Sequence, residues 1–167
     1  MTDKVLIVYA SKRGNTRRIA QAIAEGVERT GLKPALVEAT GELNADAFDL
    51  VFIGSGVYGG KFDEHVQRFL DENKWADKRV AVFACYSSSK AALDSVVTEL
   101  SHRKARVLNS LNIRCASLWN LVGLGRKLSE EDLIRARGFG ERTANNAFGY
   151  RIGKSKDKAH IKGYFKS

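Results

Sequence analysis

The sequence predicts an open α/β fold in which a parallel five-stranded sheet carries helices on both faces. Short, continuous apolar runs occupy residues 5–9, 50–53 and 80–85, and such runs are typical of central parallel strands that are buried on both faces. Stretches with helical periodicity alternate regularly with these runs. Because parallel strands need crossover connections, which are almost always right-handed, the alternation indicates a doubly wound sheet.

The two remaining strands are expected at the edges of the sheet. Residues 35–37 and 113–118 are shorter or more mixed than the central runs, and Pro34 precedes the first of them, where its missing N–H is tolerated best. Apolar residues repeated along one face predict four helices, around residues 19–27, 66–70, 93–100 and 133–148.

The composition suits a single domain with a basic tail. A chain of 167 residues with 44% apolar residues can bury a sizeable core. We expect the domain to span residues 1–149 and the tail to span residues 150–167. More than half of the net charge of +9 lies in that tail. The sequence shows neither a membrane-spanning run nor a secretory pattern, so we expect a cytoplasmic protein.

The chain has two cysteines, Cys85 and Cys115. Their spacing suggests neither a zinc site nor a disulfide framework. We therefore expect both to be reduced thiols in or near the core.

Residues 11–16, with the sequence Ser-Lys-Arg-Gly-Asn-Thr, join the first strand to the first helix. They lack the Gly-Lys-Ser/Thr ending of a nucleoside-triphosphatase loop and the three glycines of a dinucleotide fingerprint. The N–H groups at the helix start and the hydroxyls of Ser11 and Thr16 could instead surround one terminal phosphate without a metal. The alternative is that Asn15 or Thr16 only caps the helix.

Two further loops are expected beside this one, because ligands of doubly wound sheets bind beyond the carboxyl ends of the strands. Residues 55–60 follow the third strand, and Gly56, Gly59 and Gly60 would let the backbone lie against a flat ligand. The alternative is a flexible strand-to-helix turn. Residues 86–89 follow the fourth strand and offer one tyrosine and three serines.

Together these loops resemble those of flavodoxins. Residues 11–16 match the family's phosphate-loop pattern, Ser/Thr-x-Thr/Ser-Gly-x-Thr, at every fixed position except the third, where Arg13 replaces a hydroxyl. A guanidinium at that position offers the phosphate a charged contact instead. The resemblance covers residues 4 to about 148, and it implies strand order 2-1-3-4-5 and FMN as the cofactor.

The resemblance also implies a set of cofactor-binding residues. Residues 11–16 would hold the phosphate, and Tyr58 and Tyr86 would stack on the two faces of the flavin ring, unless each tyrosine only packs its own loop. The predicted FMN-binding residues are Ser11, Lys12, Arg13, Gly14, Asn15, Thr16, Ser55, Gly56, Val57, Tyr58, Gly59, Gly60, Tyr86, Ser87, Ser88 and Ser89. No catalytic side chain and no metal ligand is predicted.

Two functions are compatible with these residues, and a third is not. We favour a low-potential electron carrier, since the flavin itself would supply the chemistry. The alternative is an FMN-dependent oxidoreductase, because VYASKRGNT and IGSGVYGG are also similar to the menaquinone-dependent protoporphyrinogen dehydrogenase group, and residues 119–127 would then shape a substrate pocket or form a surface loop. A receiver domain is excluded, because Gly54 and Ser55 stand where a phosphorylatable aspartate is required.

The charge pattern predicts partners and a redox property. The basic tail fits docking on redox proteins with acidic surfaces or on an anionic membrane, unless it is simply solvated. Nucleic acid is not expected, because Tyr150, Tyr164 and Phe165 form no recognisable stacking platform. The third loop lacks carboxylates, which would destabilise an anionic reduced flavin, so we expect a second reduction step less negative than that of acidic flavodoxins.

Overall fold

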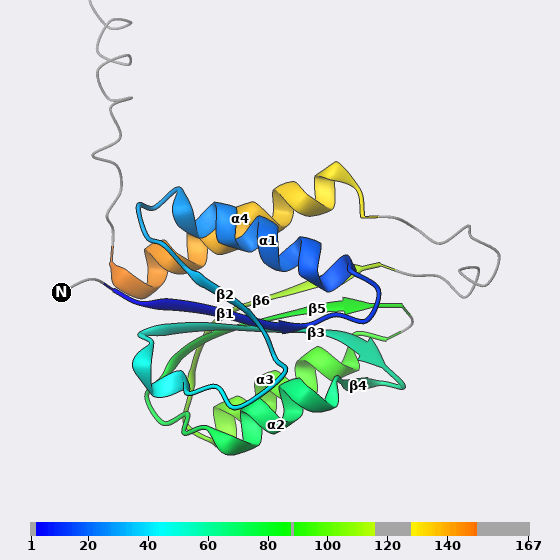
Figure 1. The fold of residues 1–167 in the computed structure, drawn as a ribbon, viewed down its shortest axis with the longest axis horizontal. Helices are drawn as coiled ribbons and strands as arrows, with labels where there is room; N and C mark the ends of the chain where they lie inside the picture. Colours follow the sequence, from blue (N-terminus) through cyan, green and yellow to red (C-terminus); the bar gives the residue numbers. More distant parts are fainter. Residues whose placement is uncertain (1–2, 88, 116–127, 150–167) are drawn as a thin grey trace, which may run out of the picture.

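The computed structural model of the protein describes residues 3–87, 89–115 and 128–149. Five of its strands build the main sheet, four helices flank it, and a short strand and a 3-10 turn complete the fold (Figure 1). In chain order the elements are β1 (Val5–Ala10), α1 (Asn15–Glu28), β2 (Ala35–Glu38), η1 (Ala45–Ala47), β3 (Leu50–Tyr58), β4 (Lys61–Phe62), α2 (Glu64–Glu72), β5 (Arg79–Tyr86), α3 (Ala91–His102), β6 (Arg106–Arg114) and α4 (Glu130–Phe148).

The order of the main sheet is β2-β1-β3-β5-β6, and all four of its pairings are parallel. Counting only the parallel strands, this is the predicted order 2-1-3-4-5, so the predicted fold class is confirmed. The carboxyl ends of β1, β3 and β5 meet at one edge of the sheet, beside the loop that leads into α1 (Figure 1).

Helices α1 and α4 cover one face of the sheet, and α2 and α3 cover the other (Figure 1). Successive strand residues point to opposite faces, and the core divides accordingly. Ile7 and Phe52 belong to the cluster under α1 and α4, whereas Val8 and Ile53 belong to the cluster over α2 and α3. This two-sided burial explains why the central strands are continuous apolar runs.

Helices α1 and α4 pack so closely that two contact positions have room only for glycine. A Cβ atom on Gly26 would collide with the backbone carbonyl of Arg137, and one on Gly140 would collide with the carbonyl of Ile23. Because backbone atoms cannot move aside as a side chain can, both positions exclude alanine unless the helices separate. The contact therefore fixes how α1 lies on the sheet, and with it the position of the helix start.

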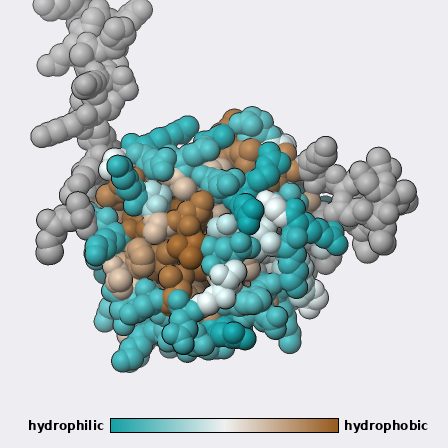
Figure 2. Space-filling model, viewed as in Figure 1, coloured by the Kyte–Doolittle hydropathy of each residue, from teal (hydrophilic) through white to brown (hydrophobic). Residues whose placement is uncertain are grey.

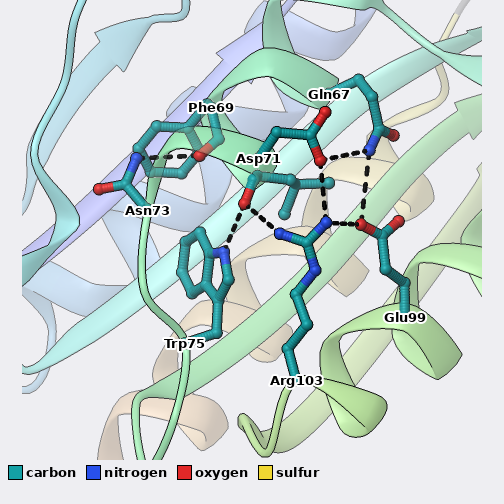
Figure 3. A network of polar contacts seen from close by, with 8 residues as sticks. Gln67, Phe69, Asp71, Asn73, Trp75, Glu99 and Arg103 are labelled. Carbon is teal, nitrogen blue, oxygen red and sulfur yellow. Dashed lines mark hydrogen bonds and ion pairs between the residues drawn. The ribbon is translucent and has the colours of Figure 1, made fainter.

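On the opposite face, a polar network ties the end of α2 to α3 (Figure 3). The carbonyl of Leu70, in the last turn of α2, accepts hydrogen bonds from the Trp75 indole (2.8 Å) and from the Arg103 guanidinium (2.7 Å). Arg103 also pairs with Asp71 and Glu99. The last carbonyls of a helix lack partners within the helix, and this network supplies partners for one of them.

Two predicted strand boundaries were wrong. The third strand continues to Tyr58 and forms an antiparallel hairpin with β4, so the glycine-rich segment is largely strand and not a loop. The last strand of the sheet spans Arg106–Arg114 instead of 113–118. As an edge strand, it mixes polar residues with buried and partly buried apolar ones and has no long continuous apolar run. The part of the prediction beyond residue 115 lies outside the described residues.

The side of the molecule seen in Figure 2 carries apolar surface over the edge strand β2, where Leu36 is exposed. No helix in the described part of the chain is long and apolar enough to cross a membrane.

Candidate functional site

A cavity of about 280 Å³ lies at the carboxyl ends of β1, β3 and β5. All three predicted loops contribute to it, and so do both cysteines. The residues that line it are Ser11, Arg13, Asn15, Thr16, Gly56, Val57, Tyr58, Gly59, Cys85, Tyr86, Ser87 and Cys115. Ten of the predicted cofactor-binding residues therefore lie around one cavity.

The other predicted residues have different places. Lys12, Gly14, Ser55, Gly60 and Ser89 are not among the lining residues. Ser88 lies outside the described residues.

The first loop ends in an open helix start. Gly14 is the N-cap of α1, with a positive φ of 85°, and no side chain of the described residues caps this helix. The Ser11 hydroxyl instead accepts a hydrogen bond from the Gly14 N–H at 3.1 Å, which closes the loop on itself. Thr16 is buried in the first turn, where it lines the cavity.

This arrangement favours a negatively charged ligand. The first N–H groups of a helix have no partners within the helix, and the helix dipole makes that end partly positive. The alternative that Asn15 or Thr16 caps α1 is not what the structure shows, because the N-cap residue is Gly14. Gly14 also leaves space, since an added Cβ atom would meet nothing within 4 Å.

The hairpin β3–β4 brings the second segment over the first loop. Its turn residues Gly59 and Gly60 have positive φ values of 58° and 79°, which glycine adopts without strain. Gly56 has a different role from the predicted one. The φ of Gly56 is not positive, and a Cβ atom at this position would collide with the Tyr58 ring.

Tyr58 connects this hairpin to the first loop. Its hydroxyl accepts a hydrogen bond from the Lys12 N–H at 3.1 Å. The Lys12 ammonium lies 4.4 Å from the centre of the Tyr58 ring, within the range of a cation–π contact. Tyr58 thus lies over Gly56 and holds the two loops together while it lines the cavity.

Ser55 and Asp63 anchor the hairpin through hydrogen bonds. The fully buried Ser55 hydroxyl donates to the Gly56 carbonyl at 2.6 Å and accepts from the Asp63 N–H at 2.8 Å. The Asp63 carboxylate caps α2 through the His65 N–H and forms an ion pair with Lys12 at 3.6 Å. Burial opposes ionisation of Asp63, but the bonds from His65 and the charge of Lys12 outweigh it and hold its pKa below the usual value.

The third loop divides between the cavity and helix α3. Tyr86 and Ser87 line the cavity, and the Tyr86 carbonyl accepts a hydrogen bond from the Cys115 N–H at 2.9 Å. Ser89 contacts the start of α3 instead, since its hydroxyl accepts a hydrogen bond from the Ala91 N–H at 3.1 Å.

The expectation of two reduced thiols was wrong, because the structure joins Cys85 and Cys115 in a disulfide with a Cα–Cα distance of 5.6 Å. Cys85 lies near the end of β5, and Cys115 directly follows β6. Sequence reasoning missed the pairing because it placed the last strand at residues 113–118. Cys115 then fell inside a strand and not at the edge of the sheet where the strands end.

The described part of the cavity wall is positively charged. Arg13 is the one fully charged residue among the described lining residues, and none of those residues is a carboxylate. The described part of the chain also contains no cluster of metal-binding side chains. The wall therefore suits an anionic ligand.

Comparison with known proteins identifies the family. The family model described as a flavodoxin domain matches residues 6–112. The chain is 27% identical over 153 residues to a flavodoxin of Clostridium saccharobutylicum, covering 85% of this chain and 96% of that protein. It is 32% identical over 125 residues to a flavodoxin of Maridesulfovibrio salexigens, covering 66% and 86%.

Solved structures agree with this assignment. Flavodoxin 2 from Bacillus cereus matches with a TM-score of 0.70 at 26% identity, over 86% of this chain and 99% of that one. A flavodoxin from the domain Archaea matches with a TM-score of 0.70 at 19% identity, over 86% and 98%, which supports the fold. The chain belongs to the flavodoxin family. Membership implies FMN as the cofactor, as predicted from the sequence.

Proposed function

We propose that the protein is an electron carrier that binds FMN in the cavity at the carboxyl ends of β1, β3 and β5. The observation that supports this most is the uncapped start of α1, which opens on a cavity lined by parts of all three loops. Oriented N–H groups and one guanidinium suit a phosphate, and two tyrosines suit a flat aromatic ring. The residues present therefore fit FMN.

In this proposal the first loop holds the phosphate. The N–H groups in the first turn of α1 donate to it, and the Ser11 and Thr16 hydroxyls and Arg13 add polar contacts. Lys12 supports the loop indirectly, because its N–H and ammonium group already contact Tyr58. Gly14 keeps the approach free of a side chain.

The hairpin and the third loop would enclose the flavin ring. Tyr58 and Tyr86 offer aromatic faces, and stacking of this kind contributes about 0.5–1.5 kcal/mol beyond burial. Val57 and Gly59 add apolar surface and exposed backbone. Bound FMN would supply reversible electron transfer, and the chain would set its potential and shield it from water.

Flavodoxins pass electrons between redox partners, and we propose such partners with acidic surfaces for this basic chain. An anionic membrane surface is a second candidate for docking, and a cytoplasmic location is part of the proposal. The basic tail that motivated both lies outside the described residues, as do residues 119–127, which were named for the alternative oxidoreductase. That alternative gains no support from the described cavity.

A reconstitution experiment tests the carrier function. The FMN-loaded protein is mixed with a flavoprotein reductase, NADPH and a cytochrome acceptor, and reduction of the cytochrome is followed optically. We expect reduction to depend on this protein and to slow as the salt concentration rises. Steady turnover of a porphyrin precursor with quinone, without a partner reductase, would instead establish the oxidoreductase.

A further inference from the structure

We propose that Cys85 and Cys115 form a redox-active disulfide that exchanges an electron pair with the flavin bound beside it. This inference rests on the proposed binding of FMN in the same cavity. It gives the protein a second redox centre, with a capacity of two electrons, in addition to the cofactor. The flavodoxin domain match ends at residue 112, so it does not include Cys115.

The disulfide lies on the wall of the cavity. Both cysteines line the cavity, together with Tyr58, Tyr86 and the Gly56 backbone. Cys85 belongs to β5 and Cys115 directly follows the neighbouring strand β6, where Cys85 lies opposite Ile113 in the ladder. The hydrogen bond from the Cys115 N–H to the Tyr86 carbonyl keeps this arrangement beyond the end of β6.

Bulk solvent has little access to the two sulfur-bearing residues. Cys115 is only 2% exposed, and Cys85 is half-buried. A group bound in the cavity therefore reaches this disulfide more directly than a reductant in bulk solvent. In the proposed complex that group is the flavin.

The fold does not need a bridge at this place to hold the two strands together. Strands β5 and β6 are already paired from Arg79 opposite Arg106 to Tyr86 opposite Arg114, so the disulfide links backbones that hydrogen bonds hold side by side. A cross-link stabilises mainly by restricting the unfolded chain, which does not require a position on the cavity wall. In reducing compartments, moreover, protein disulfides are usually catalytic or redox-sensing.

The reaction balances without a further oxidant or reductant. The anionic reduced flavin gives up two electrons and one proton and returns to its oxidised form, and water supplies a second proton. The Cys85–Cys115 bond accepts the electron pair and breaks, and each sulfur takes up one proton. The products are oxidised flavin and two thiols, and the reverse reaction restores the disulfide.

Photoreduction tests this step, because light with EDTA delivers electrons through the flavin. The FMN-loaded protein is illuminated without oxygen, quenched with acid and alkylated, and thiols are counted by mass. We expect none before illumination and about two per chain afterwards, as a two-electron couple requires. The apoprotein without FMN should gain none under the same light, and the C85S/C115S variant should gain none with FMN.

A titration gives an independent count. With dithionite, the wild-type holoprotein should take up about four electrons per FMN and the double variant about two, since only the flavin remains. Flavin that becomes fully reduced while the wild-type thiol count stays at zero, or free thiols already present in the protein as isolated, would overturn the proposal. Failure of FMN to bind would overturn the proposed function as well, and the absorption of the protein shows it before illumination.

Discussion

Helices α1 and α4 pack against each other, yet they begin in opposite ways. At the start of α4, the Ser129 hydroxyl accepts from the Asp132 N–H at 3.1 Å, and the Asp132 carboxylate accepts from the Ser129 N–H at 3.1 Å. This capping box satisfies the helix start from within the chain. At the start of α1, Gly14 supplies no such side chain.

At these two helix starts the same fold separates stability from binding. In α4 the N–H groups of the first turn bind the helix's own cap, whereas in α1 the corresponding N–H groups are presented to the cavity. A change at the start of α4 should therefore alter the stability of the protein, and one at the start of α1 should alter ligand affinity.

Asn15→Asp should separate the two properties most clearly. A carboxylate in the first turn of α1 interacts favourably with the helix dipole, so the apoprotein should become no less stable and gain up to about 1 kcal/mol. The same carboxylate would repel the phosphate by roughly 3 kcal/mol, which weakens FMN binding about 100-fold. Calorimetry and thermal unfolding measure both effects.

The control for this variant is Asn146→Asp, which makes the same charge change at an exposed position of α4. Its FMN affinity should stay within about twofold of the wild type, because screening limits distant surface charges. Equal losses of affinity in the two variants would contradict a phosphate site at α1.

Gly140→Ala should act on the packing between the two helices. The added methyl group meets the Ile23 carbonyl, and overpacking of this kind costs about 1–3 kcal/mol. We expect a loss of about 2 kcal/mol in the free energy of unfolding, measured with urea. Gly41→Ala, where a Cβ atom meets nothing within 4 Å, is the control, and an equal loss there would argue against the close helix contact.

Arg13→Gln should make reduction of the bound flavin harder. A unit charge about 8 Å away contributes roughly 2 kcal/mol at an effective dielectric near 20. Because Arg13 is exposed, screening by solvent reduces this electrostatic contribution. We therefore expect the second one-electron potential of the flavin to fall by about 50 mV. Arg18→Gln, on the exposed side of α1, should leave the potential unchanged in the same spectroelectrochemical titration.

Ser129→Ala removes the cap of α4 and should lower the free energy of unfolding by about 1 kcal/mol. FMN affinity should not change, because Ser129 does not line the cavity. Ser95→Ala, at an exposed position inside α3, is the control for loss of a hydroxyl. A weaker affinity for FMN in Ser129→Ala would break the distinction between the two helix starts.

The pH dependence of the free energy of unfolding should show the contribution of Asp63, which is the smallest effect expected. Since the pKa of Asp63 is lowered in the folded protein, the unfolded chain binds its proton first as the pH falls. The stabilisation is thus complete above the ordinary carboxyl pKa and is lost as the pH falls through the folded value. We expect the stability advantage over Asp63→Asn, at most about 1 kcal/mol, to shrink over this range.

Asp46→Asn, at an exposed position, is the matched control in urea titrations between pH 7 and acid. An advantage of the wild type over Asp63→Asn that grew as the pH fell would contradict the lowered pKa.

The sequence was informative where a pattern is repeated and local. Continuous apolar runs identified the central strands, and the Ser-Lys-Arg-Gly-Asn-Thr segment identified the first loop. The hairpin β3–β4 was missed because four glycines between residues 54 and 60 argue for a loop, whereas two of them allow close contacts within the strand. Gly54 accommodates the Phe83 ring of the neighbouring strand β5, a contact that depends on tertiary structure, and Gly56 accommodates the Tyr58 ring of its own strand.

The disulfide was missed for a related reason. Its two cysteines are 30 residues apart in the chain, and only the register of β6 on β5 brings them together. Because β6 is a mixed edge strand, the sequence pattern did not fix that register. The uncapped start of α1 could be predicted only in part. Gly14 is visible in the sequence, but only the structure shows that no side chain of the described residues caps the helix.

Calorimetric titration of the apoprotein with FMN and with riboflavin, which lacks the phosphate, measures whether the start of α1 binds the phosphate. If the open start of α1 holds the phosphate, FMN will bind at one site and riboflavin will bind about 100-fold more weakly. Equal affinity for the two ligands, or no heat of binding with FMN, would contradict the account.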